Sequence, residues 1–152
     1  MPKTPRSVVN FLPSALALAA LAFSGLALPT PPPGAYVVIV NPANGLASID
    51  RAYLQDIFLK KITRWPDGEA VRPVDLAANS PVRDRFTEEL LGRSVDAVKA
   101  YWQQRIFSGR DVPPPELDSS EEVVAYVLRH PEAVGYVARA TKLSGAKILA
   151  VE

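Results

Sequence analysis

The residues best suited to hold a ligand lie where a helix is expected to begin after a short strand. Ser80 has the small hydroxyl side chain that caps helices, and Pro81 suits the first helical position. A helix start exposes backbone N–H groups and the positive end of the helix dipole, and both favour an anion. Asn79 precedes this start and Arg83 follows one turn along. The pattern predicts a candidate site for a small oxyanion at Ser80, Asn79 and Arg83.

The same residues also have a purely structural interpretation. Ser80 would then only cap its helix, and Arg83 would be a surface charge in solvent. Pro81 weakens the anion site, because its ring nitrogen carries no N–H group. The residue types leave both interpretations open.

The chain offers little for catalysis. Its single histidine, His130, precedes Pro131 at an expected helix end, where a cation is favoured by the helix dipole. Asp67 and Asp75 flank an expected strand, where a turn or capping role is typical. No serine has a G-x-S-x-G context, and no spacing of His, Asp and Glu resembles a metal site. There is no cysteine, so disulfides and thiolate ligands are excluded. We predict no enzyme activity, no metal and no cofactor.

Strands and helices alternate along the chain that must position these residues. The apolar run from Ala35 to Pro42 is typical of a strand buried on both faces, as in a parallel sheet. Further strands are expected at 70–76, 133–138 and 146–152. Helices are expected at 48–60, 80–92, 94–107 and 119–130, with Ser48, Ser80, Ser94 and Ser119 or Ser120 as caps. The alternation predicts an α/β three-layer sandwich, with helices covering a mainly parallel sheet.

The stretch IFLKKITRWPDG, residues 57–68, places a tryptophan among cations. Lys60 and Lys61 suit the C-terminal end of a helix, and residues 66–68 form a turn signal. Trp65 packs over that turn in one interpretation. In the other, Trp65 and Lys61 form an interaction surface.

Three segments, in this order, resemble the periplasmic phosphate-binding proteins, which are the substrate-binding components of phosphate ABC transporters. That family shows an IF-x-G-K-I-x-x-W-x-D segment, a Ser/Gly-rich phosphate loop that opens a helix, and a late P-x-A-I-G-Y-V strand. The residues that match the first and last segments are Ile57, Phe58, Lys61, Ile62, Trp65, Asp67, Pro131, Ala133, Gly135, Tyr136 and Val137. Lys60 stands where the family prefers glycine. The resemblance covers residues 36 to 140 and implies a fold like one lobe of a type 2 periplasmic binding protein, at about half the family's usual size.

The phosphate loop of this chain departs from the family's R-S-D-G-S-G-T pattern. Ser80 matches the retained serine. Leu76 replaces the arginine, Ala78 the aspartate, Pro81 a glycine and Val82 the threonine. A phosphate dianion with so few donors would be poorly compensated for its lost water. The resemblance therefore implies the family's fold, while these residues argue against tight phosphate capture by this chain alone.

The first residues of the chain indicate export. Lys3 and Arg6 precede an apolar run that ends in small residues, which predicts a signal peptide at 1–27, cut near Ala27. An uncleaved membrane anchor is the alternative. A Pro-rich linker at 28–34 and a domain at 35–152 follow. Loss of residues 1–27 removes two cations and no acid, so the net charge changes from +1 to −1. Such a balance disfavours general nucleic-acid binding.

Two functions follow from these observations. The first is a periplasmic or secreted solute-binding module that binds phosphate or another small oxyanion weakly. The second is a non-enzymatic envelope module that has lost its ligand and docks to a partner. An ABC permease or an envelope sensor would be the partner, and a homodimer could supply a second lobe. The sequence leaves the oligomeric state open.

Overall fold

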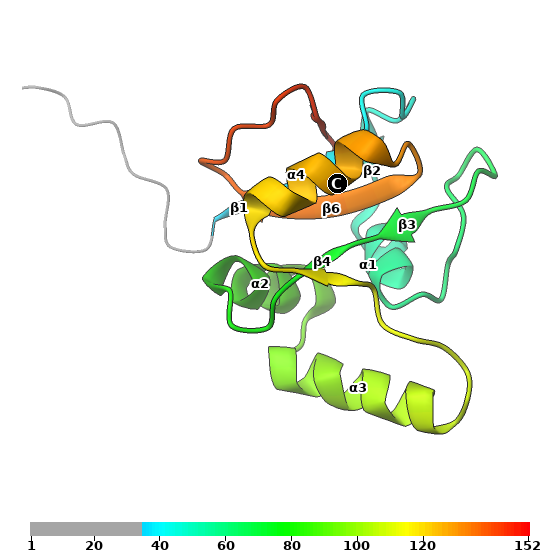
Figure 1. The fold of residues 1–152 in the computed structure, drawn as a ribbon. Coiled ribbons are helices and arrows are strands. Elements are labelled where there is room, and N and C mark those ends of the chain that lie inside the picture. Colours follow the sequence, from blue (N-terminus) through cyan, green and yellow to red (C-terminus); the bar gives the residue numbers. More distant parts are fainter. Residues whose placement is uncertain (1–34) are drawn as a thin grey trace, which may run out of the picture.

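The computed structural model describes residues 35–152, which form helices packed around a central sheet (Figure 1). The expected signal peptide at 1–27 and linker at 28–34 lie outside the described residues. Within residues 35–152, no helix has the length and apolar character needed to cross a bilayer.

The central sheet has the strand order β3-β6-β1-β7. Its bounds are Arg72–Pro73 for β3, Ala133–Ala138 for β6, Tyr36–Val40 for β1 and Lys147–Ile148 for β7. β1 runs antiparallel to β6 from Tyr36, opposite Ala138, to Val40, opposite Val134. β1 is also antiparallel to β7, whereas β3 is parallel to β6.

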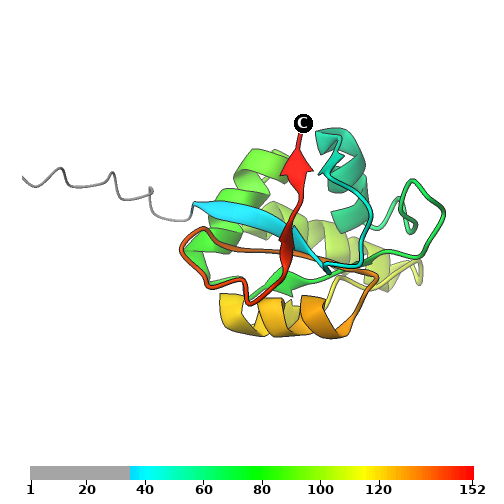
Figure 2. The same cartoon turned by 90° about the horizontal axis from the view of Figure 1, so that it is seen from above.

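The structure also has two separate two-stranded parallel sheets, one of which contains the C-terminal strand (Figure 2). β2 (Ser48–Ile49) pairs with β8 (Ala150–Val151), and β4 (Asp75–Leu76) pairs with β5 (Glu116–Leu117). The α/β class is confirmed, and the strands form both parallel and antiparallel pairs. The expectation that β1 has parallel neighbours is wrong. The continuous apolar run of β1 arises because helices bury the strand on both faces. Burial of this kind does not determine whether the neighbouring strands are parallel or antiparallel.

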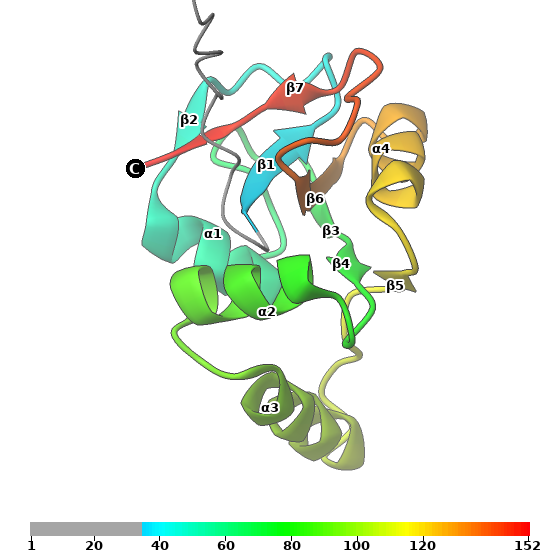
Figure 3. The ribbon, with the colours of Figure 1, turned by 90° about the vertical axis from the view of Figure 1, so that its left-hand side faces the viewer.

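Helices cover both faces of the sheet, which gives the three expected layers (Figure 3). α4 (Ser120–Arg129) packs on one face against β6 and β1. α1 (Arg51–Phe58) and α2 (Pro81–Phe86) lie on the other face. α2 continues as a π-helical turn, η1 (Thr87–Leu91). α3 (Val95–Phe107) lies further out and contacts η1.

Most of the predicted helix ends are confirmed. Ser80, Ser94 and Ser119 each accept a hydrogen bond from an amide of the first turn. Gly92 ends η1 with a φ of 62°, in the left-handed region that glycine adopts at low cost. The predicted cap Ser48 is wrong. It lies in β2, and Asp50 caps α1 by accepting from the amide of Tyr53 at 3.0 Å.

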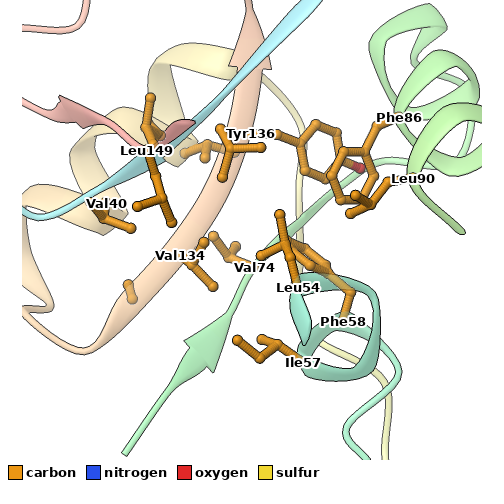
Figure 4. Packing of buried hydrophobic residues seen from close by; sticks show 14 of the residues in the cluster. Val40, Leu54, Ile57, Phe58, Val74, Phe86, Leu90, Val134, Tyr136 and Leu149 are labelled. Atoms are coloured by element: carbon orange, nitrogen blue, oxygen red, sulfur yellow. The ribbon is translucent and has the colours of Figure 1, made fainter. Parts of the chain in front are cut away.

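An aromatic cluster fills the space between the sheet and the helices α1 and α2 (Figure 4). The rings of Tyr136 and Phe86 stack with centroids 3.6 Å apart, and Phe58 meets Phe86 edge to face at 4.8 Å. Tyr136 and Phe86 are fully buried. These two side chains therefore hold α2, the helix that follows the candidate site, against the strand β6.

Candidate functional site

The candidate site is the loop between β4 and α2. The chain leaves β4 at Leu76 and turns back at Ser80, whose amide donates to the carbonyl of Ala77 at 2.9 Å. Ser80 Oγ accepts from the amide of Arg83 at 3.4 Å, which is the predicted capping bond. Asn79 is exposed and Ser80 is half-buried. The structure thus brings Asn79 and Ser80 to the surface at the start of α2.

Arg83 begins on the same helix turn, but its side chain goes inward and is only 4% exposed. Its Nη1 donates to the carbonyl of Leu76 at 2.6 Å and lies 2.8 Å from Asp75 Oδ1. Glu116 Oε1 is 3.4 Å from the same atom. The interpretation of Arg83 as a solvated surface charge is therefore wrong. Its charge is satisfied inside the protein, so it adds little to an anion at the exposed loop.

Asp75 forms the other half of this buried cluster. Tyr136 donates its hydroxyl hydrogen to Asp75 Oδ1, and the amide of Leu76 donates to the same oxygen at 3.1 Å. Burial raises the pKa of Asp75 to about 6, although Arg83 and the Tyr136 hydroxyl oppose this change. Burial, with the Asp75 charge next, also raises the pKa of Tyr136. The cluster is therefore a buried carboxylate held by one guanidinium and one hydroxyl.

The sequence prediction missed this role of Asp75, which it assigned to a turn or cap. Asp67 does fill such a role, because its Oδ1 accepts from the amide of Glu69 at 3.0 Å. Asp75 differs by lying inside the strand segment, between the buried residues Val74 and Leu76. A carboxylate in that position needs a buried partner, and this is the signal that could have identified it.

A small pocket adjoins the loop and the buried cluster. Its volume is about 290 Å³, and it lies between the loop and α3. Its polar lining residues are Arg83, Lys99, Gln103 and Glu116, and Ala78, Trp102 and Ile106 are among the apolar ones. The Nε atom of Arg83 is buried without a hydrogen-bond partner among the described residues.

The second predicted group is divided: Lys61 lies just after the end of α1, where its amide donates to the carbonyl of Asp56 at 2.8 Å, and Trp65 lies in the hairpin that follows. Arg64 and Ala70 form an antiparallel bridge, and the amide of Trp65 donates to the carbonyl of Glu69 at 2.7 Å. Trp65 is 3% exposed and belongs to the hydrophobic core. This burial agrees with the packing interpretation and corrects the picture of Trp65 as an exposed docking residue. Lys61 is exposed and pairs with Asp56 at 3.0 Å.

The strands and helices define a three-layer α/β fold. No known family profile matches the chain, and no curated protein matches it in sequence.

Solved structures place the fold more closely. An ABC-type phosphate transport receptor from Vibrio cholerae matches with a TM-score of 0.59 and 20% identity, over 78% of this chain and 48% of that chain. A putative phosphate ABC transporter substrate-binding protein with bound phosphate from Clostridium perfringens matches with a TM-score of 0.60 and 20% identity, over 78% and 46%. PstS from Borrelia burgdorferi matches with a TM-score of 0.59 and 16% identity, over 78% and 47%. The chain shares its fold with these proteins and spans about half of their length.

Proposed function

We propose that the protein is an exported solute-binding module that contacts phosphate or another small oxyanion weakly at the Ala77–Ser80 loop. The observation that carries the proposal is the fold, which is shared with transport proteins described as phosphate receptors. In this chain the loop follows a strand and opens a helix, and Asn79 and Ser80 reach the surface there. Transport through an ABC permease and a periplasmic or secreted location belong to the same proposal, and so does the lack of enzyme activity.

Weak binding follows from the contacts of the loop. Pro81 has no N–H group to donate to an anion. The Arg83 guanidinium forms ion pairs with Asp75 and Glu116 and does not face the loop. The remaining donors are the Ser80 hydroxyl, the Asn79 side chain and neighbouring amides. A tetrahedral dianion needs more partners than these for tight capture.

Calorimetry and thermal unfolding with phosphate, with sodium chloride of equal ionic strength as the reference, test the proposal. A ligand that binds only the folded state must raise the melting temperature. Ser80→Gly removes the hydroxyl while lowering capping by only a few tenths of a kcal/mol, so it separates binding from stability. Absence of heat and of any rise in melting temperature at millimolar phosphate would contradict the proposal. If phosphate gave Ser80→Gly the same heat and the same rise in melting temperature as the wild type, Ser80 would not contact the ligand.

A second function is favoured by the internal pairing of Arg83 and by the replaced loop donors. In this proposal the module has lost its ligand and docks to a partner, either a permease or an envelope sensor. Lys61, which is exposed between the end of α1 and the Trp65 hairpin, would lie at the contact. A photo-crosslinking residue at position 61 should then capture a defined envelope protein, while one at the exposed position Lys142 should not. Identical capture from both positions would count against this contact.

A further inference from the structure

A groove of about 500 Å³ lies along β1, beside the end of α2 and η1. It exists because β7 pairs with β1 only at Ile39 and Val40. After β7 the chain turns away from β1, and the next strand, β8, pairs with β2. The first half of β1 therefore has no strand on this side, and Figure 3 shows β1 between β7 and α2. Apolar side chains that line the groove include Val37, Ile148 and Val151.

Three arginines from different elements line the same groove. Arg51 opens α1, Arg85 lies in α2 and Arg139 follows β6. Arg51 Nη1 donates to the carbonyl of Glu89 at 2.8 Å, and Arg139 Nη2 donates to the carbonyl of Tyr36 at 3.5 Å. Each bond uses one N–H donor and leaves the other donors of that guanidinium available to a ligand.

The charges of the groove are only partly balanced. Arg85 forms an ion pair with the Glu89 carboxylate, which also lines the groove. Among residues 35–152, neither Arg51 nor Arg139 has a carboxylate within ion-pair distance. The charged side chains that line the groove, three arginines and one glutamate, sum to +2. Burial, with the Glu89 charge next, raises the pKa of Tyr36, whose ring also lines the groove.

We propose that this groove is a binding site for an organic phosphate monoester. Guanidinium groups match phosphate oxygens in paired hydrogen bonds, and the charge of +2 matches the dianion. The apolar body of the ligand would lie against Ile148, which is 52% exposed, and Val151. Inorganic phosphate lacks such a body and should bind more weakly here. The site uses no residue of the Ala77–Ser80 loop and does not depend on the proposed function.

Calorimetry with phenyl phosphate, inorganic phosphate and phenol tests this site in the protein as isolated. Phenyl phosphate should bind more tightly than either of the other two probes. The double variant Arg51→Gln/Arg139→Gln should weaken phenyl phosphate binding at least about tenfold, because hydrogen bonds to charged groups are lost. The control Arg110→Gln/Arg129→Gln changes the charge equally at exposed positions outside the groove and should bind like the wild type.

A variant with the opposite effect keeps the test decisive if the double variant folds poorly. Glu89→Gln retains the backbone carbonyl that holds Arg51 and frees Arg85 from its ion pair. It should therefore tighten phenyl phosphate binding severalfold, with a steeper salt dependence. The site is refuted if phenyl phosphate does not bind, if the arginine pair can be replaced without loss, or if Glu89→Gln weakens binding.

Discussion

At the scale of single residues, the ion pair between Asp75 and Arg83 is the most consequential feature. The folded-state pKa of Asp75, about 6, lies above its ordinary value of 3.8, and burial is the first cause. Between these two values the folded protein holds a proton that the unfolded chain has released. The contribution of Asp75 to the free energy of unfolding therefore falls as the pH rises from about 4 to about 6.

Replacement of Arg83 by methionine should make this pH dependence stronger. Without the guanidinium, the Asp75 carboxylate has lost its cation, so its pKa should rise further and ionisation should cost more. We expect Arg83→Met to lower the free energy of unfolding by roughly 3–5 kcal/mol at pH 8, and by much less at pH 4.5, where Asp75 is protonated. Urea unfolding at the two pH values measures the difference, and Asp75→Asn/Arg83→Met should abolish it. An equal loss at both pH values would show that the ion pair is not the cause.

Lys60 carries a second residue-scale effect. Its φ of 51° lies in the left-handed region, just after the end of α1. Glycine adopts this conformation at a lower cost than lysine. Lys60→Gly should raise the free energy of unfolding by about 0.5–1 kcal/mol, less any contribution from the 3.7 Å ion pair with Asp111.

The neighbouring residue supplies the control for this substitution. Lys61 has no positive φ, so Lys61→Gly should lower stability or leave it unchanged. Both variants can be compared by denaturant unfolding under one set of conditions. A stabilising Lys61→Gly, or a destabilising Lys60→Gly, would contradict the strain at Lys60.

At the scale of elements, the close approach of α4 to β6 depends on Gly135. A Cβ atom at this position would lie 2.6 Å from Val123 Cγ1 and 2.9 Å from Val74 Cγ1. Gly135→Ala should therefore destabilise the protein by roughly 1–3 kcal/mol through overpacking. Gly45→Ala is the matched control, since nothing lies within 4 Å of the added carbon there. Thermal unfolding of the two variants measures the effect, and equal melting temperatures would contradict tight packing at Gly135.

The elements were also the part of the structure that the sequence predicted best. Capping serines at 80, 94 and 119 and the strand 133–138 were identified from local signals, and these signals act within one turn or one strand. The direction of β1 and the inward course of Arg83 were not predicted. Both depend on partners distant in sequence, such as Val134 for Val40 and Glu116 for Arg83. The groove on β1 was missed for the same reason, because its arginines come from three separate elements.

At the scale of the whole molecule, one hydrophobic cluster joins all the layers. It includes Leu54 of α1, Phe86 of α2, Trp102 of α3, Val123 of α4 and Tyr136 of β6. There is no cysteine, so no disulfide contributes to the stability of the chain. Because the layers share this core, removal of one exposes the apolar surface of the others.

The domain should therefore unfold in a single cooperative step. The two tryptophans report on distant parts of it, because Trp65 lies in the hairpin after α1 and Trp102 in α3. In the variants Trp65→Phe and Trp102→Phe, the remaining tryptophan gives a local fluorescence signal, and far-UV circular dichroism gives a global one. Within each variant the two signals should share one midpoint in urea, as two-state unfolding requires. An earlier fluorescence transition for Trp102 alone would show that α3 opens as a separate unit, since α3 packs on the outside of the molecule and buries only Val98 and Trp102.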